Sequence, residues 1–198
     1  MAKHVFLTGP PGIGKTTLIQ KTSEVLKSLG VPIDGFYTEE VRESGRRVGF
    51  DVVTLGGRRG ILSRVSSGPS AGRHEYHVGS YVVDLASFEQ LALPLLRNAG
   101  LGSSAIKKVC VIDEIGKMEL FSQSFIQAVH QILSGSGVVM LGTIPVSKGK
   151  PLGLVEEIRN HKEVKVFSNL TGLAYDVRKM TLPRNGLNGV EKIAVARV

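Results

Sequence analysis

The sequence predicts an α/β fold: a three-layer sandwich in which helices cover both faces of a mostly parallel β-sheet that carries a small antiparallel insertion. Three observations predict it. An apolar segment, His4–Thr8, leads through a glycine-rich turn directly into a helical pattern. Two further apolar runs, Val109–Ile112 and Val138–Leu141, are typical of strands buried on both faces of a parallel sheet. Helical patterns alternate with these runs, and 198 residues is the length of one domain.

The first elements follow from apolar spacing and turn residues. His4–Thr8 is an expected strand, Gly9–Gly14 is a Gly/Pro-rich turn, and a helix is expected from Lys15 onward. Gly30, followed by Val31-Pro32, ends this helix. Its buried face repeats at helical spacing through Leu18, Ile19, Thr22, Val25, Leu26 and Leu29.

An antiparallel insertion is expected next. Ile33–Arg42 and Arg46–Leu55 have the pattern of two strands joined by a short turn at Glu43-Ser44-Gly45, and Gly60–Val65 is a candidate third strand. The segment 66–72, with the sequence SSGPSAG, is the clearest loop of the chain. We interpret it as a loop inside the domain.

The second half alternates strands and helices. Val78–Val83 is an expected strand, and Asp84 is placed to cap a helix that Pro94 is expected to kink or shorten. After a loop at 100–104, the strand Val109–Ile112 ends at Asp113. The remaining expected elements are a helix through Phe121, Phe125, Val129 and Ile132 that ends at Gly135, the strand Val138–Leu141 leading into Gly142-Thr143, a short helix Leu152–Ile158 and a last strand Val164–Phe167.

Composition excludes several classes of protein. Hydrophobic residues make up 42% of the chain and charged residues 21%, which is ordinary globular usage. No apolar run approaches the roughly 20 residues that a membrane helix needs. The apolar stretch within Met1–Thr8 is too short for a secretory signal. Cys110 is the only cysteine, which excludes an intrachain disulfide and fits a reducing compartment. We therefore expect a soluble cytoplasmic protein with no membrane partner.

The formal charge of +8 raises the question of nucleic-acid binding. The basic residues are dispersed, however, so nucleic acid is not an expected partner. A monomer is the expected state. One subset stands apart: seven arginines and no lysine lie between residues 42 and 73. These side chains either surround a bound triphosphate or lie on the surface of a hairpin. They are Arg42, Arg46, Arg47, Arg58, Arg59, Arg64 and Arg73.

The most specific motif is a phosphate-binding loop. Its pattern is G-x-x-x-x-G-K-[ST], and the residues are Gly9, Pro10, Pro11, Gly12, Ile13, Gly14, Lys15 and Thr16, with Thr17 following as a further candidate for nucleotide binding. The glycines allow close approach of the backbone to phosphate, and the helix that begins near Lys15 directs its positive end at the anion. Lys15 is expected to reach the β- and γ-phosphates, and the Thr16 hydroxyl to ligate Mg²⁺.

A second candidate site follows the strand Val109–Ile112. Asp113 ends this apolar strand, where it can complete the Mg²⁺ coordination shell from the side of the sheet. Glu114 follows immediately and is a candidate general base that accepts a proton from the attacking water. Thr143 ends the next apolar strand, where it either senses the γ-phosphate and the attacking water or simply ends the strand.

The segment Asp113–Gly116 also fits the D-x-x-G pattern of GTP-binding switches. The N-K-x-D sequence that reads guanine is absent, since residues 160–163 are Asn-His-Lys-Glu. The sequence therefore does not indicate which nucleobase is preferred, and the expected activity is hydrolysis of nucleoside triphosphates with little selection among bases.

Three segments together resemble the P-loop nucleoside-triphosphatase family: Gly9–Thr16, Gly35–Arg42 (GFYTEEVR) and Asp113–Glu119 (DEIGKME). The resemblance covers roughly residues 3–167. It implies a P-loop fold with a small antiparallel addition and slow, broad, Mg²⁺-dependent hydrolysis of nucleoside triphosphates to diphosphates. On the matching positions it implies that Gly9–Thr16 bind phosphates, that Asp113 belongs to the metal shell and that Glu114 is the base.

The resemblance also supports two finer predictions. Residues 1–167 form the nucleotide-hydrolysing domain, and residues 168–198 form a C-terminal tail that departs from the family pattern. Arg42 is the first candidate for a catalytic arginine, because its segment is part of the resemblance.

Two rival functions stay open. The first is a nucleotide or small-molecule kinase, with the arginine-rich region as a lid. The second is a nucleotide-dependent binding module without turnover.

Overall fold

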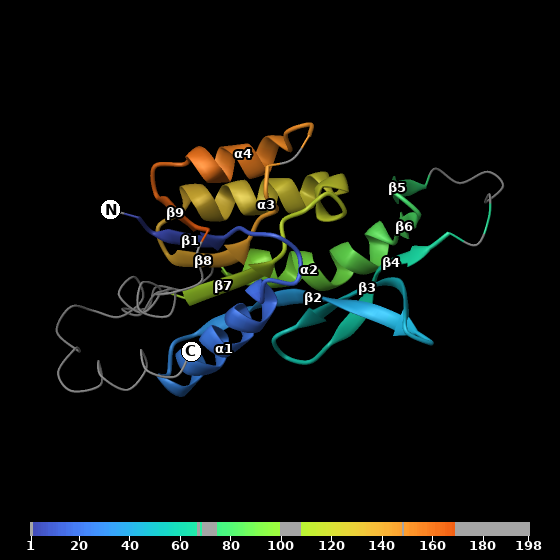
Figure 1. Cartoon of the computed structure of the whole chain (residues 1–198). Coiled ribbons are helices and arrows are strands. Elements are labelled where there is room, and N and C mark those ends of the chain that lie inside the picture. The colour runs from blue at the N-terminus through green and yellow to red at the C-terminus, as the bar shows by residue number, and fades with distance from the viewer. Residues whose placement is uncertain (1, 67, 69–74, 100–107, 148, 169–198) are drawn as a thin grey trace.

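One mixed β-sheet of nine strands organises the chain, with helices on both of its faces (Figure 1). This computed structural model describes residues 2–66, 68, 75–99, 108–147 and 149–168. The strand order is β5-β6-β4-β3-β2-β7-β8-β1-β9. The elements are β1 (His4–Leu7), α1 (Lys15–Ser28), β2 (Ile33–Glu43), β3 (Arg46–Thr54), β4 (Arg59–Val65), β5 (Tyr76–Val78), β6 (Tyr81–Val83), α2 (Leu85–Ala99), β7 (Lys108–Asp113), the 3₁₀ turn η1 (Glu119–Phe121), α3 (Gln123–Ser134), β8 (Val138–Thr143), α4 (Gly153–Asn160) and β9 (Val164–Phe167). The predicted α/β sandwich is confirmed.

The parallel part of the sheet brings the predicted site together. Strands β2, β7, β8, β1 and β9 pair in parallel, so their carboxyl ends lie along one edge. Leu7 is in register with Thr143, and Tyr37 with Asp113. Because β8 separates β1 from β7, the loop after β1 faces Asp113 across the end of β8.

The antiparallel part continues the same sheet. β2 is shared, since it pairs in parallel with β7 and antiparallel with β3, and β4, β6 and β5 then extend the sheet. The predicted turn between the first two strands is present at Ser44-Gly45, with φ values of 48° and 79°. The single predicted strand Val78–Val83 is wrong, because Gly79, with φ of 59°, turns the chain and splits this region into the short hairpin β5–β6.

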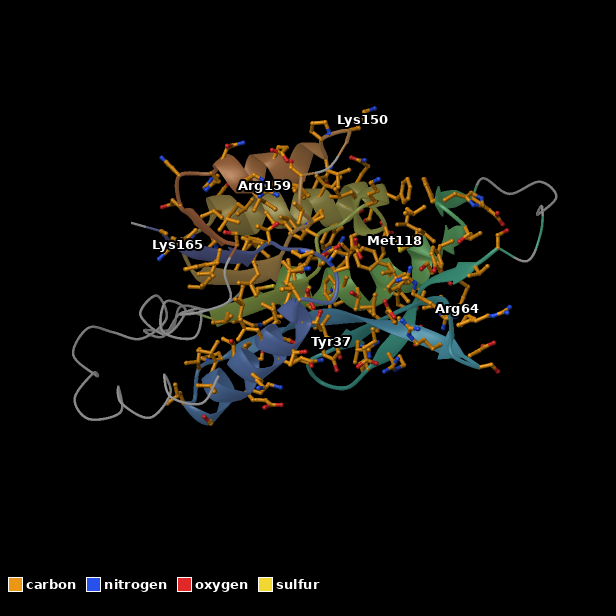
Figure 2. All side chains as sticks on the ribbon, viewed as in Figure 1. Tyr37, Arg64, Met118, Lys150, Arg159 and Lys165 are labelled. Carbon is orange, nitrogen blue, oxygen red and sulfur yellow. The ribbon has the colours of Figure 1, made fainter. Side chains whose placement is uncertain are left out.

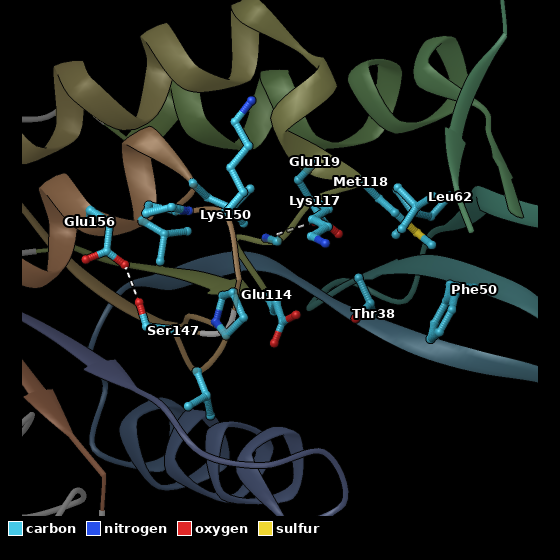
Figure 3. A pocket seen from close by; sticks show the side chains of 17 residues that line it. Thr38, Phe50, Leu62, Glu114, Lys117, Met118, Glu119, Ser147, Lys150 and Glu156 are labelled. Atoms are coloured by element: carbon cyan, nitrogen blue, oxygen red, sulfur yellow. Dashed lines mark hydrogen bonds between the residues drawn. The ribbon is translucent and has the colours of Figure 1, made fainter. Parts of the chain in front are cut away.

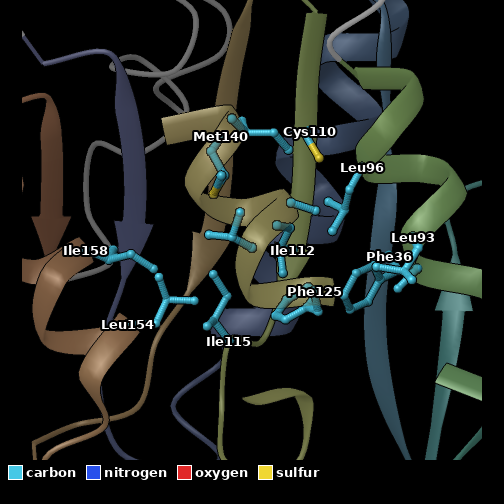
Figure 4. Packing of buried hydrophobic residues seen from close by; sticks show 14 of the residues in the cluster. Phe36, Leu93, Leu96, Cys110, Ile112, Ile115, Phe125, Met140, Leu154 and Ile158 are labelled. Carbon is cyan, nitrogen blue, oxygen red and sulfur yellow. The ribbon is translucent and has the colours of Figure 1, made fainter. Parts of the chain in front are cut away.

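Two apolar cores hold the three layers together. Helix α1 packs on one face through Leu18, Ile19 and Leu26. Helices α2, α3 and α4 pack on the other face, where the rings of Phe36, Phe88 and Phe125 make edge-on and tilted contacts at centroid distances of 5.2–6.2 Å. Figure 4 shows Phe36 and Phe125 in this core. Cys110 belongs to this second core, and burial raises the pKa of its thiol to about 12, which keeps it protonated.

Two predictions concern helix α2: the cap at Asp84 and the effect of Pro94 on the length of the helix. Asp84 caps it as predicted, because its Oδ1 accepts the Ser87 backbone N–H at 2.9 Å. The helix nevertheless continues through Pro94 to Ala99, so Pro94 does not shorten it, and the alternative of a kink stays a prediction. Pro94 lies on the exposed side of the helix, as does Gln90, so the carbonyl that proline leaves without a partner can bind water.

Some expectations fall outside the described residues: the loop segments at 69–72 and 100–104, and the tail from residue 169. Within the described ranges, no helix has the length and apolar character needed to cross a membrane.

Candidate active site

The phosphate-binding loop lies between β1 and α1, at the carboxyl edge of the sheet. Gly12 and Gly14 adopt φ values of 77° and 97°, which favour glycine. Gly14 is the N-cap residue of α1, and no side chain in the described part of the chain caps it. The first N–H groups of the helix are therefore available to an anion, and the helix dipole favours negative charge there.

Lys15 folds back over this loop. Its Nζ donates to the carbonyl oxygens of Gly9 and Pro10, at 2.9 and 3.2 Å. Of the other predicted residues, Ile13 extends an apolar side chain that is 51% exposed, and Thr17 lies on the exposed side of the first turn. The loop thus presents backbone N–H groups and one ammonium group to the same space.

Asp113 and Thr143 meet next to this loop. Both are buried, at 2% and 0% exposure, and the Thr143 hydroxyl donates to Asp113 Oδ1. Burial raises the pKa of Asp113, while the Thr143 and Thr16 hydroxyls and the Lys15 charge lower it. Thr16, Asp113 and Thr143 therefore lie together at one edge of the sheet.

The side chains of Asp113 and Thr16 are suited to bind a divalent cation. Asp113 Oδ2 is buried and has no hydrogen-bond partner among the described residues, and the Thr16 hydroxyl faces the same carboxylate. The described ranges hold no group of three or more His, Cys, Asp or Glu side chains suited to a metal. Mg²⁺ needs no such group, since it usually binds one or two carboxylates together with substrate phosphates and waters. Thr16 and Asp113 are thus the candidate ligands.

Glu114 projects from the end of β7 into a cavity (Figure 3). The pKa of its carboxyl is raised by burial first and by the charge of Asp113 second, while Lys15 lowers it. The peptide after it is anchored, because the N–H of Ile115 donates to the Thr143 carbonyl at 2.9 Å. A carboxylate whose pKa is raised is a stronger base than one in water.

The cavity has a volume of about 300 Å³. It opens on the sheet face opposite α1, because its apolar wall includes Leu62 and Val155 of the second core. Sequence reasoning missed most of its lining, which comes from separate segments of the chain. The lining residues are Thr38, Phe50, Leu62, Val78, Glu114, Gly116, Lys117, Met118, Glu119, Pro145, Val146, Ser147, Lys150, Pro151, Leu152, Val155 and Glu156.

Four of the seven arginines, Arg42, Arg47, Arg59 and Arg64, form ion pairs on the antiparallel part of the sheet, where Arg64 is visible in Figure 2, and Arg73 lies outside the described residues. Arg59 and Arg64 both pair with Asp51, at 2.9 and 2.7 Å, and Arg47 pairs with Glu40 at 2.9 Å. These contacts favour decoration of the hairpin over a triphosphate site for those three arginines.

Arg42 lies near the exposed end of the same hairpin. It pairs with Glu40 at 2.6 Å and donates to the Gly45 carbonyl at 3.2 Å. Arg42 is not one of the described residues that line the cavity. Its catalytic role stays a prediction.

Glu119 is a buried acid beside Glu114. Its Oε2 accepts the Gly116 backbone N–H at 2.9 Å. The pKa of Glu119 is raised from 4.5 to about 8, by burial first and then by the charges of Glu114 and Asp113, against two backbone hydrogen bonds that lower it. Glu119 is therefore mostly protonated at neutral pH.

This shift predicts how stability depends on pH. The unfolded chain releases the Glu119 proton near pH 4.5 and the folded chain near pH 8, so its contribution to stability is complete below pH 4.5 and is lost as pH rises toward 8. Glu119→Gln cannot ionise. We expect its free energy of unfolding, relative to the native chain, to rise between pH 5 and pH 8 by at most about 1.4 kcal/mol per pH unit. Parallel urea titrations measure the difference, and identical pH dependences contradict it.

Similarity to known proteins agrees with this geometry. The profile of a family described as NTPase matches residues 4–176. The human protein named cancer-related nucleoside-triphosphatase is 73% identical over 168 residues, which covers 85% of this chain and 88% of that protein. The mouse homologue is 64% identical over 183 residues, covering 92% and 94%.

Two solved structures share the fold. The solution structure of a human cancer-related nucleoside triphosphatase superposes with a TM-score of 0.77 at 69% identity, covering 90% of this chain and 96% of that one. The crystal structure of THEP1 from the hyperthermophile Aquifex aeolicus superposes with a TM-score of 0.67 at 39% identity, covering 88% and 94%. The family match runs to residue 176, beyond the boundary predicted at 167, and that boundary stays a prediction. By this match and by these relatives, the chain belongs to the NTPase family.

Proposed function

We propose that this chain hydrolyses nucleoside triphosphates, ATP and GTP among them, to diphosphate and phosphate, with Mg²⁺ as cofactor. The observation that carries the proposal is the convergence of the phosphate-binding loop with Asp113, Glu114 and Thr143 at one edge of the sheet. The names of the human and mouse relatives, both nucleoside-triphosphatases, support it. A monomeric, cytoplasmic enzyme is the simplest form of this proposal.

Each residue has a defined part in the reaction. The N–H groups at the start of α1 and the Lys15 ammonium group bind the β- and γ-phosphates and offset their charge. Thr16 and Asp113 would hold Mg²⁺, which, when bound, neutralises charge that develops between these phosphates. Thr143 orients the Asp113 carboxylate through its hydrogen bond.

Glu114 completes the site as the base. It accepts a proton from water while the water oxygen attacks the γ-phosphorus, and the bond from that phosphorus to the β–γ bridging oxygen breaks. The raised pKa of Glu114 favours this role, and the adjoining cavity gives the water access. Broad use of nucleotides is part of this proposal, because the sequence holds no N-K-x-D segment to select guanine.

A second candidate activity is phosphoryl transfer to a hydroxyl acceptor. The cavity of about 300 Å³ that Glu114 lines is larger than one water needs and carries Lys117 and Lys150. In this reaction the acceptor oxygen replaces water, and Glu114 receives the acceptor proton.

Release of phosphate from ATP, GTP, CTP and UTP tests the proposal. We expect release from each nucleotide with Mg²⁺ and no acceptor, and loss of release when a chelator removes the metal. Nucleoside monophosphates serve as trial acceptors. Formation of nucleoside diphosphate only when these acceptors are added favours the transferase. Nucleotide binding without any turnover of the triphosphate favours a binding module.

A further inference from the structure

Glu119 is a buried acid that this mechanism does not use. Its side chain is 4% exposed and it opens the turn η1, directly after the segment that carries Asp113 and Glu114. Burying a carboxyl group costs free energy unless hydrogen bonds or a proton compensate. A glutamate at this place therefore indicates a function beyond the local turn.

Glu119 and Glu114 converge on Gly116. A methyl group added to Gly116 would lie 3.0 Å from Glu114 Oε1 and 3.1 Å from Glu119 Oε2. Both carboxyl groups thus occupy the space next to the Gly116 Cα, and both line the same cavity (Figure 3). The Gly116 N–H points to Glu119 rather than to Glu114, with a distance of 2.9 Å to Glu119 Oε2.

We propose that Glu119 is a positioning residue for Glu114. Its hydrogen bond fixes the backbone at Gly116, while the bond from the Ile115 N–H to the Thr143 carbonyl fixes the residue before it. Its carboxyl group also fills space beside Glu114 and so limits the rotamers open to Glu114. Glu114 is held with its carboxylate directed to the place of the attacking water. The inference rests on the proposed function, in which Glu114 is the base.

Three substitutions at one position separate geometry from charge. Glu119→Ala removes the acceptor, and Glu119→Asp withdraws it by one methylene. Glu119→Gln keeps an acceptor for the Gly116 N–H in the shape of a neutral carboxyl group. We expect the first two to lower kcat about 10- to 100-fold, because a base displaced by about 1 Å loses activity on this scale. Gln restores most of this loss, and the KM for ATP changes little in all three.

Glu157→Ala is the matched control. Glu157 is a carboxylate of helix α4 that lies 3.2 Å from His130, and it is not among the described residues that line the cavity. Its loss is expected to leave kcat unchanged. Gly116→Ala provides an independent approach, since its methyl group would press on both carboxyl groups. Gly116 is absent from the described glycines with positive φ, so this change adds no backbone strain, and we expect lowered kcat in a stably folded variant.

A double-mutant cycle decides whether Glu119 acts through Glu114. We expect Glu114→Gln/Glu119→Ala to have the kcat of Glu114→Gln alone, because the positioned group is already lost. Equal kcat for the native chain and for Glu119→Ala and Glu119→Asp overturns the inference and leaves the proposed function intact. Multiplicative losses in the cycle also overturn it. Full activity of Glu114→Gln overturns the assignment of the base, and the positioning role with it.

Discussion

Glu114→Gln is expected to lower kcat for hydrolysis about 10²- to 10⁴-fold, the range attributed to general acid–base catalysis. Glutamine has nearly the same shape but cannot accept the proton of the attacking water. The residues expected to bind phosphate, Gly9–Thr16, are untouched, so the affinity for nucleoside triphosphate should hold within about threefold, or about 0.65 kcal/mol. Steady-state phosphate release and a binding titration with ATP measure the two quantities separately.

Glu157→Gln serves as the control for this substitution. Glu157 is a carboxylate on helix α4 that pairs with His130 at 3.2 Å, and it is not among the described residues that line the cavity. Its kcat should equal that of the native chain. Native turnover in Glu114→Gln contradicts the assignment of Glu114 as base, and equal losses of affinity and kcat indicate a role in binding instead.

Gly35→Ala is expected to destabilise the fold by about 3 kcal/mol or more, through overpacking against a rigid neighbour together with backbone strain. Gly35 of β2 is in register with Val111 of β7. A methyl group there would lie 2.6 Å from the Val111 nitrogen, 2.8 Å from its carbonyl carbon and closer still to its oxygen. These are backbone atoms of a central strand, which cannot move aside. Denaturant unfolding measures the loss.

Gly45→Ala separates the two costs at Gly35. Gly45 also has a positive φ, 79°, but a methyl group there meets nothing within 4 Å. Only the conformational penalty remains, about 1–2 kcal/mol. A loss at Gly35 no greater than that at Gly45 would contradict the close approach of β2 to β7.

The predictable part of the fold is the part set by local pattern. The unit of β1, loop and α1 combines an apolar strand, a glycine-rich turn and a helical repeat within one short segment, and β7 and β8 are uninterrupted apolar runs. The hairpin β5–β6 was not predicted, because two strands of three residues around Gly79-Ser80 give too little alternation to separate them. The passage of α2 through Pro94 depends on which face packs against the sheet, and tertiary packing decides that.

The same distinction applies to the site. A contiguous motif marks the phosphate-binding loop, and Asp113 and Thr143 are found because carboxyl ends of parallel strands share an edge. The cavity could not be predicted, since its lining comes from segments with no common pattern. Glu119 shows the limit most clearly. A charged residue after a strand normally faces solvent, whereas Glu119 is buried and accepts a hydrogen bond from the Gly116 N–H.

Hydrolysis of ATP in ¹⁸O-enriched water is the most direct test of the claim that water attacks the γ-phosphate. Mass spectrometry of the products locates the label. We expect one solvent oxygen in each released phosphate and none in the diphosphate, because water attacks the γ-phosphorus and the bridging oxygen leaves with the diphosphate. Label in the diphosphate, or diphosphate formed only when an acceptor is present, contradicts the account.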